Sequence, residues 1–358
     1  MDMRIICGAD VPAGADPVGA VHELYLEACR EGRTDKSAGS AQTPLSLIPV
    51  DRETAAGWFC APGRITYTLW DGSRAVGMAS GMTDTGRRCG YLSFAYILPQ
   101  YRNRGLGTRL LDAWEADVSA SPDADKLEAA FYCPVHLPWY VPRQDTDDAR
   151  QLDWHPCVPG VDVASGLYRM LQNRGFRDYA IQNAYHQRLA GYTDPPALAR
   201  TRERLLSEGI ELTMYDETRH RGLAELFDNI RNPGWKAQVM AHTDRPIVVA
   251  VDHNADELVV SYTGPLSVDG KRDGRPGRGN FCGIGTRTEY RGRGIGKLVF
   301  CEMCRRHAAA GADFMTLYTG DNNPARNIYE AAGFRITRTF ACMRKELKAS
   351  PHNARLTP

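Results

Sequence analysis

One short motif occurs twice in the chain, and this repetition constrains the fold more than any other feature. Residues 101–108 read Tyr-Arg-Asn-Arg-Gly-Leu-Gly-Thr, and residues 290–297 read Tyr-Arg-Gly-Arg-Gly-Ile-Gly-Lys. Each copy is followed by a Tyr and then a Gly-Phe pair, namely Tyr168 with Gly175-Phe176, and Tyr329 with Gly333-Phe334. Two motifs that recur in the same order indicate a duplicated domain.

The segments around the two motifs predict the same order of elements. Short β-type runs precede each copy, at 65–70, 75–81 and 91–98 and again at 247–251, 258–262 and 281–286. Apolar residues then follow helical periodicity after each motif, and a further strand is expected at 127–132 and at 314–319. Each half is therefore predicted to be an α/β or α+β unit.

The spacing of the motifs shows where the halves differ. Gly105 and Gly175 are 70 residues apart, whereas Gly294 and Gly333 are 39 residues apart, so the first half carries 31 extra residues. We place them at 133–162, an aromatic, acidic and Pro-rich insertion that is either a surface loop or a substrate wall. The predicted domains are 1–194, with this insertion, and 195–348, followed by a tail at 349–358.

Composition excludes several classes of protein. The net charge is +1, which gives no global electrostatic case for binding nucleic acid or an anionic membrane. No apolar run approaches the roughly 18 residues of a membrane span, and the N-terminus lacks the apolar core of a signal peptide. Ten Cys without such a signal indicate reduced thiols, and hence a cytoplasmic protein.

Two groups of cysteines are candidate metal or redox sites. Cys301 and Cys304 have CxxC spacing, but they lie within a predicted helix with no second pair nearby, so packing is the simpler interpretation. A second group offers four zinc-type ligands at irregular spacing, and whether they bind zinc stays open: Cys133, His136, His155 and Cys157. No metal is expected.

The glycine motif itself predicts a phosphate site. Glycines let the backbone approach an anion, and the N–H groups of the following helix point at it with the positive end of the helix dipole. The pattern is neither a dinucleotide-binding fingerprint nor a Walker loop, because the glycine spacing of the first and the Gly-Lys-Ser/Thr of the second are missing.

The motif pair resembles the GNAT family of acetyl-CoA-dependent N-acetyltransferases. In the second half the resemblance rests on residues 289–297 together with Asn322-Asn323-Pro324-Ala325-Arg326-Asn327-Ile328-Tyr329 and Gly333-Phe334. In the first half it rests on residues 99–107. It spans about 300 residues as a tandem pair, an arrangement seen in mycothiol synthase and in some antibiotic self-resistance acetyltransferases. The implied fold is a mixed α/β one, with two tandem domains whose mostly antiparallel sheets are flanked by helices.

The resemblance also implies roles for individual residues. Tyr329 matches the general acid that protonates the leaving thiolate, and Asn322 matches a residue that contacts the cofactor. The strand end at Ile284, Gly285 and Thr286 would run beside the pantetheine and hydrogen-bond the thioester carbonyl. The pyrophosphate of acetyl-CoA would be bound by the loop residues of the second half, and by their counterparts if the first half holds cofactor: Arg291, Gly292, Arg293, Gly294, Ile295, Gly296 and Lys297, with Arg102, Asn103, Arg104, Gly105, Leu106, Gly107 and Thr108.

The first half departs from the pattern at the catalytic position. Tyr168 stands seven residues before Gly175, whereas Tyr329 stands four before Gly333, so counting back from Gly175 places Leu171 where the acid is expected. Tyr168 lies one helical turn earlier and remains a candidate substitute. We therefore expect a weakened first half and a catalytic second half. The general base is unmarked: Asp321 or a chain of waters is a candidate, and His307 and Glu302 are expected to be structural or exposed.

The predicted function is acetyl transfer from acetyl-CoA directly to the amine of a small molecule, such as an amino sugar, an antibiotic or an amine metabolite. The acceptor class rests on the insertion, whose carboxylates would hold a cation. Three alternatives remain: a mycothiol-synthase-like enzyme, a protein or peptide N-acetyltransferase, and a non-catalytic coenzyme A-binding module. The protein is expected to be a monomer or a homodimer, with no nucleic-acid or membrane partner.

Overall fold

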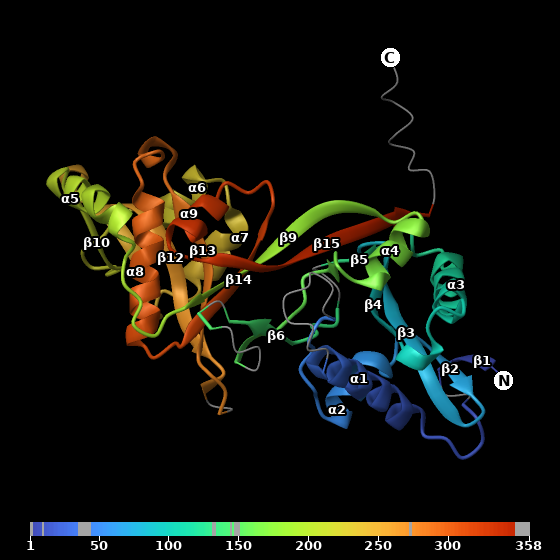
Figure 1. Cartoon of the computed structure of the whole chain (residues 1–358). Coiled ribbons are helices and arrows are strands. Elements are labelled where there is room, and N and C mark those ends of the chain that lie inside the picture. The colour runs from blue at the N-terminus through green and yellow to red at the C-terminus, as the bar shows by residue number, and fades with distance from the viewer. Residues whose placement is uncertain are drawn as a thin grey trace. The chain divides into compact units, whose positions relative to one another are not determined.

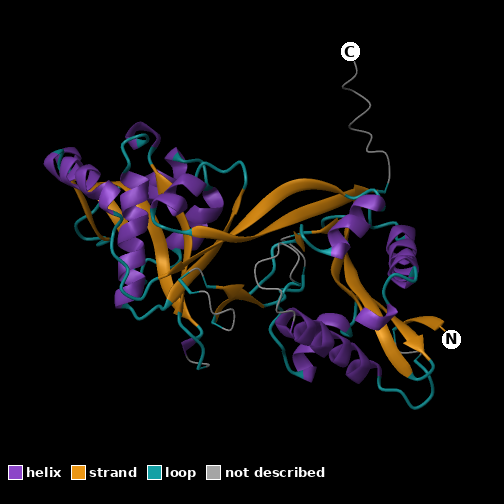
Figure 2. Ribbon diagram, in the orientation of Figure 1, coloured by secondary structure: helices purple, strands orange, loops and turns teal. Residues whose placement is uncertain are grey.

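The computed structural model describes residues 3–8, 11–34, 44–130, 134–143, 145–146, 151–271 and 274–347. Its contacts divide the chain into two compact units (Figure 1). Unit 1 comprises Met1–Val141, Trp154–Asn183 and Arg338–Pro358, and unit 2 comprises Pro142–Asp153 and Ala184–Thr337. Each unit combines a mixed sheet with helices (Figure 2), so the predicted α/β class is confirmed.

Unit 1 contains the elements expected around the first glycine motif. A strand and two helices precede a three-stranded antiparallel run, and a helix then leads to a short parallel strand. These elements are β1 (Met3–Cys7), α1 (Pro17–Thr34), α2 (Arg52–Phe59), β2 (Arg64–Asp71), β3 (Arg74–Asp84), β4 (Cys89–Ile97), α3 (Leu106–Ala120), β5 (Lys126–Ala129) and α4 (Gly166–Asn173).

Unit 2 repeats this order after one additional helix. That helix is α5 (Ala199–Ser207), and the repeated elements are β10 (Ile210–Met214), α6 (Leu223–Asn229), α7 (Pro233–Met240), β11 (Val248–Asp252), β12 (Leu258–Asp269), β13 (Arg278–Thr286), α8 (Ile295–Ala309), β14 (Phe314–Gly320) and α9 (Arg326–Ala331). From β4 to the end of α3, and from β13 to the end of α8, the copies align without a gap. The predicted strands and helices of both halves are thus present.

The last strands of the two repeats, β9 (Arg177–Arg188) and β15 (Arg335–Glu346), are each divided between the units. Met343–Glu346 of β15, at the end of the second repeat, pair antiparallel with Ala129–Lys126 of β5 in unit 1. Residues 184–188 of β9, at the end of the first repeat, belong to unit 2, where β9 is the neighbour of β14. Each sheet is therefore completed by a strand from the other repeat.

The 133–162 insertion also contains regular structure. β6 (Trp139–Pro142) and β7 (Leu152–His155) form a separate two-stranded sheet, and β8 (Val161–Asp162) pairs with β15. Residues 142–153 are grouped with unit 2, although the insertion lies within the first repeat of the sequence.

Two apolar layers hold the sheet of unit 2. On one face, α8 buries Leu298, Val299 and Phe300 against alternate residues of the strands. On the other face, Phe227 of α6 and Val239 of α7 pack on β11 and β12. This burial on both faces accounts for the apolar runs seen in the sequence. In the described part of the chain, no helix has the length and apolar character needed to span a membrane.

Candidate active site

Both glycine motifs fold into the same turn between a strand and a helix. In the second repeat, Gly292 and Gly294 have φ angles of 76° and 83°, and α8 begins immediately afterwards. In the first repeat, Asn103 and Gly105 have φ angles of 60° and 72° before α3. Most side chains are disfavoured at positive φ, so the turn favours glycine at these positions, and asparagine, which tolerates this region, at residue 103.

The turn before α8 leaves a row of backbone donors unpaired. No side chain caps this helix, and in the described ranges the N–H groups from Gly292 to Lys297 donate no hydrogen bond. Such groups at a helix N-terminus favour an anionic ligand, because the dipole adds a partial positive charge there. The second loop can therefore hold a phosphate group, as the sequence predicts.

The arginine and tyrosine at the start of each motif hold the turn in place. Arg102 and Arg291 donate through Nε to the carbonyls of Ile97 and Thr286, at 2.9 and 3.2 Å. The preceding tyrosines act equivalently in the two units: the Tyr101 hydroxyl donates to Asp71 at 2.9 Å, and the Tyr290 hydroxyl donates to Asp252 at 2.8 Å. The repeat therefore extends to individual hydrogen bonds.

The last glycine of each motif sets how closely the next helix approaches. A Cβ on Gly296 would lie 3.2 Å from Ile328 of α9, and a Cβ on Gly107 would lie 3.2 Å from Met170 of α4. Met170 thus corresponds to Ile328, which makes Leu171 the counterpart of Tyr329. Backbone bonds support the same register, because the Phe176 N–H donates to Leu171 and the Phe334 N–H donates to Tyr329.

The strands that precede and follow each loop separate after a few residues. In the described residues, β13 and β14 pair in parallel at Arg278–Phe314 and Gly279–Met315 and no further. Beyond this point, Ile284 and Gly285 pair with β12 on the other side of β13. Among the described residues, the edge of β13 that faces β14 is therefore not paired with another strand between Gly279 and the glycine loop.

Comparison with known proteins agrees with this geometry. The model of the acetyltransferase (GNAT) family matches residues 21–132, and the model of FR47-like proteins matches residues 274–344. The chain belongs to the GNAT family. It carries the family's domain in tandem, and it is an acyltransferase for which the fold implies acetyl-CoA as cosubstrate.

Solved structures share the fold over the whole chain. The glucosamine N-acetyltransferase region of a fungal multi-domain β-N-acetylglucosaminidase is 18% identical with a TM-score of 0.58, covering 96% of this chain, which spans 38% of that protein. A GCN5-related N-acetyltransferase of Sphaerobacter thermophilus is 18% identical with a TM-score of 0.54, covering 97% of this chain and 96% of the other. A tandem GNAT protein from the clavulanic acid biosynthesis pathway is 16% identical with a TM-score of 0.51, covering 97% of this chain and all of the other (100%). No curated protein sequence matches.

Tyr329, at the position of the GNAT general acid, lies in an aromatic environment. Its side chain is 7% exposed, and its ring contacts those of Phe300 and Tyr185 with centroids 5.0 and 6.0 Å apart. Burial, with a smaller contribution from Tyr185, raises its pKa to about 12. Among the described residues, the Tyr329 hydroxyl neither donates nor accepts a hydrogen bond. That hydroxyl is thus protonated near neutral pH and available to a ligand.

Tyr168 is placed differently from Tyr329. Its hydroxyl donates to Asp178 at 2.6 Å, and this hydrogen bond, followed by burial, raises its pKa to about 12. Its place in the helix matches that of Arg326 rather than Tyr329. The structure therefore gives Tyr168 a local partner and places Leu171, which is 1% exposed, at the position of the acid.

The other residues singled out in the sequence fall into two groups. Asn322 and Asp321 lie in the exposed turn after β14, where Arg326 contacts the backbone and side chain of Asp321 at 3.3 and 3.5 Å. Glu302 and His307 are buried in α8, where Glu302 pairs with Arg305 and Arg306. Glu302 and His307 thus pack within the unit.

The candidate metal and redox groups do not form a metal centre where they are described. Cys301 and Cys304 are buried in α8, and desolvation raises the pKa of both thiols, so they pack in the core. Of the zinc candidates, Cys133 lies outside the described residues, and His136 is exposed. The described ranges contain no cluster of three potential metal ligands.

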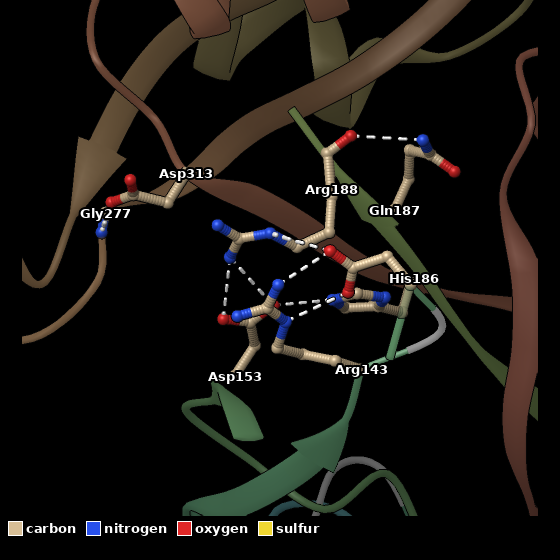
Figure 3. A network of polar contacts seen from close by, with 8 residues as sticks. Arg143, Asp153, His186, Gln187, Arg188, Gly277 and Asp313 are labelled. Carbon is tan, nitrogen blue, oxygen red and sulfur yellow. Dashed lines mark hydrogen bonds and ion pairs between the residues drawn. The ribbon is translucent and has the colours of Figure 1, made fainter. Parts of the chain in front are cut away.

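The sequence did not predict a buried group on β9. The side chains of His186, on β9, and Asp153, on β7, are 0% and 1% exposed. His186 Nε2 lies 2.7 Å from Asp153 Oδ2 (Figure 3). The weak signal for this pair was the acidic insertion itself, but nothing in the sequence connected residue 153 with residue 186.

Proposed function

We propose that the chain transfers the acetyl group of acetyl-CoA directly to the amine of a small molecule, and that the second repeat performs this reaction. The observation that carries the proposal is the register at the last glycine of each motif, which gives Tyr329 to the second repeat and Leu171 to the first. Leucine has no proton to donate, so this acid function is confined to one repeat.

The strand ends support the same assignment. In unit 2 the residue one before the end of β13 is Gly285, whereas its counterpart on β4 is Tyr96. The Tyr96 hydroxyl donates to Glu31 at 2.9 Å, and Glu31 accepts two bonds from Arg102, at 2.6 and 2.7 Å. The first loop therefore has its leading arginine already neutralised by a carboxylate, and we regard Arg102–Thr108 as the weaker cofactor loop.

In the second repeat the proposed roles follow from position. The N–H groups of Gly292–Lys297 bind the pyrophosphate, and Arg291 adds positive charge at the loop's edge. The backbone of Ile284–Thr286 lies along the pantetheine arm and stabilises the thioester oxygen, and Asn322 contacts the cofactor from the turn after β14. These donors act by position, without reorganising during the reaction.

The reaction needs one nucleophile and one proton donor. The neutral amine attacks the thioester carbon, the carbon–sulfur bond breaks, and the thiolate takes the proton of the Tyr329 hydroxyl. The new amide nitrogen loses a proton to Asp321 or solvent, and Tyr329 regains one from solvent. Because burial raises the pKa of Tyr329 to about 12, this side chain carries its proton before each turnover. We keep Asp321 and solvent as candidate bases for the ammonium form of the acceptor.

The acceptor class is the least specified part of the proposal. Similarity of fold to a glucosamine N-acetyltransferase region makes D-glucosamine the first probe, with other amino sugars, aminoglycoside antibiotics and amine metabolites after it. The carboxylates predicted to hold a cation are described in part: Asp145 pairs with Arg143, and Asp153 pairs with Arg188. These two are therefore occupied by arginines, while Asp147 and Asp148 lie outside the described residues.

We infer the cellular location of the protein from its cysteine thiols. The described cysteines form no disulfide, which supports a cytoplasmic location. We propose a monomer or a homodimer, with the two sequence repeats, 1–194 and 195–348, meeting near residues 194 and 195.

Thiol release from acetyl-CoA tests the function. The full chain is incubated with acetyl-CoA and each amine in turn, and liberated coenzyme A is measured with a thiol reagent. Turnover on D-glucosamine or another small amine is expected. Turnover confined to peptide N-termini or lysine side chains would indicate a protein acetyltransferase. Coenzyme A binding without turnover on any amine would indicate a binding module.

A further inference from the structure

The insertion of the first repeat is partly built into the second unit. Residues 142–153 are grouped by their contacts with residues 184–337. We call the described part of this segment, residues 142–143, 145–146 and 151–153, the strap. Its position is unexpected from the sequence, because the insertion lies between β5 and α4 of the first repeat.

A buried ionic group fixes the strap to β9 (Figure 3). Asp153 accepts from His186 at 2.7 Å and from Arg188 at 3.1 and 3.2 Å. Taking a carboxylate out of water is costly unless charged or polar partners satisfy it, and here they do. The strap is therefore attached at a defined place on the strand.

A second ion pair orders the strap nearer its N-terminal end. Arg143 donates to both oxygens of Asp145, at 2.9 and 2.6 Å, and Arg188 lies 3.9 Å from the same carboxylate. The hydrogen bond from Arg143 lowers the pKa of Asp145, so this carboxylate stays charged near neutral pH. Arg188 thus joins the two carboxylates of the strap.

The alternation of β9 shows which face of the sheet the strap covers. Tyr185 points to the α8–α9 face, where its ring contacts Tyr329. His186 points to the opposite face and stacks on Phe314 of β14, with ring centroids 6.0 Å apart. The strap is therefore on the face opposite the proposed general acid.

This opposite face is the one from which an amine would approach. The cofactor loop and Tyr329 belong to the α8–α9 side, and β13 and β14 stop pairing after Gly279–Met315. A nucleophile that attacks a thioester held between these strands must come from the side that the cofactor leaves free. On that side, Trp235 of α7 lies against Gly283 of β13. The strap lies against β9, whose His186 stacks on Phe314 of β14.

We propose that the strap is the acceptor-side wall of the second unit's active site, and that Asp153, His186 and Arg188 are the residues that position it. The first repeat thus supplies an element of the second repeat's specificity.

The test compares steady-state constants, and it rests on the proposed function. Asp153→Asn removes the charge that holds His186 and Arg188, and Arg143→Ala loosens the partly exposed end of the strap without opening the core. Both are assayed by thiol release with acetyl-CoA and D-glucosamine, or the best amine of the panel if D-glucosamine is not turned over. We expect amine KM to rise about tenfold or more, with acetyl-CoA KM within about twofold of the unmodified chain.

The matched control is Asp162→Asn in unit 1. Asp162 is also a buried carboxylate, 6% exposed and paired with Arg338 at 2.5 Å, but it is not part of the strap. It should leave amine KM unchanged. If Asp153→Asn does not fold, Arg143→Ala decides the outcome.

Three results would overturn the inference. Unchanged amine KM in the strap variants would make the strap a structural device. If acetyl-CoA KM rose as much as amine KM, the strap would act on cofactor binding rather than on the acceptor side. A rise of the same size in Asp162→Asn would show a general loss of stability. Absence of turnover in the unmodified chain is a separate result, which refutes the proposed function and this inference with it.

Discussion

The two repeats use the same backbone at the glycine loop and different side chains around it. Val118 and His307 occupy the same place in α3 and α8, and each packs on a glycine of the preceding strand, Gly90 and Gly279 respectively. Likewise Leu171 stands where Tyr329 stands, and Tyr96 stands where Gly285 stands. Both repeats contain the residues that form the turn. Only the second has a proton donor at the acid position, and it has a glycine where the first has Tyr96.

The sharpest test of this asymmetry is Tyr329→Phe, which removes one proton donor and keeps the ring. General acid–base groups contribute roughly 10²–10⁴-fold, so kcat should fall by about that factor while acetyl-CoA affinity barely changes. Tyr168→Phe is the matched control, because its hydroxyl is bonded to Asp178. Normal kcat in Tyr329→Phe with an inactive Tyr168→Phe would reverse the comparison.

The exchange of final strands predicts a crossed effect on stability. Phe340 is 0% exposed and contacts Trp139 in unit 1, although it comes from the second repeat. Phe340→Ala should destabilise unit 1 by about 3–5 kcal/mol, the usual cost of emptying a buried Phe site. Phe334→Ala, at a 2% exposed site, should act on unit 2 instead.

Tryptophan fluorescence during urea unfolding can separate these effects. Trp235 is grouped with unit 2 and the other tryptophans with unit 1. A Phe340→Ala transition that moves only the Trp235 signal would refute the exchange.

Acid should destabilise the second unit more than the first. Burial, and then Arg278, lowers the pKa of His307 from the ordinary value of 6.5 to about 4. The folded form therefore binds this proton less readily than the unfolded form, and stability is full above pH 6.5 and is lost as pH falls towards 4. The loss at pH 4 is about 3 kcal/mol, from 1.36 kcal/mol per pKa unit.

The first repeat supplies the control variant, since His307→Val copies Val118. In His307→Val, the free energy of unfolding of unit 2, followed by Trp235 fluorescence, should decline less between pH 6.5 and pH 4 than in the unmodified chain. A decline of the same size in both proteins would show that groups other than His307 cause the loss of stability.

The smallest expected effect concerns the loops. Gly294→Val places a side chain at φ 83° and directs its Cβ to within 2.8 Å of Thr201. Strain of about 1–3 kcal/mol predicts a roughly 10- to 100-fold loss of acetyl-CoA affinity, measured by calorimetry. Gly105→Val is also strained, at φ 72°, although its Cβ meets nothing within 4 Å. It should leave turnover nearly unchanged, because it lies in the loop that we regard as the weaker cofactor site. Unchanged affinity of the Gly294→Val, Gly105→Val double variant would refute both loops as cofactor sites.

Much of the local backbone around the candidate site was predictable from the sequence, because it depends on the spacing of neighbouring residues. The hairpin at 71–74 forms between β2 and β3, and α8 starts at Ile295, directly after a glycine at positive φ. The count back from Gly175 that places Leu171 opposite Tyr329 agrees with the contacts of Gly107 and Gly296. The counts succeed because a helix and its C-terminal turn keep fixed residue spacing.

The role of the insertion was not readable in this way. The sequence predicts that its carboxylates hold a cation, but those described are paired with Arg143 and Arg188. Composition shows that charges are present, but it gives no information on their partners. Those of Asp153, which are His186 and Arg188, come from a strand more than 30 residues later in the chain.

The sequence by itself determined the duplication, the two phosphate-type loops and the single repeat with a correctly spaced tyrosine, because each depends on the spacing of neighbouring residues. Only the tertiary structure decided which strands complete which sheet, and that residues 142–153 belong with the second unit. Strand pairing and buried ion pairs join residues that are far apart in the chain. A β-strand pattern shows that an edge must be paired, but it does not specify the partner.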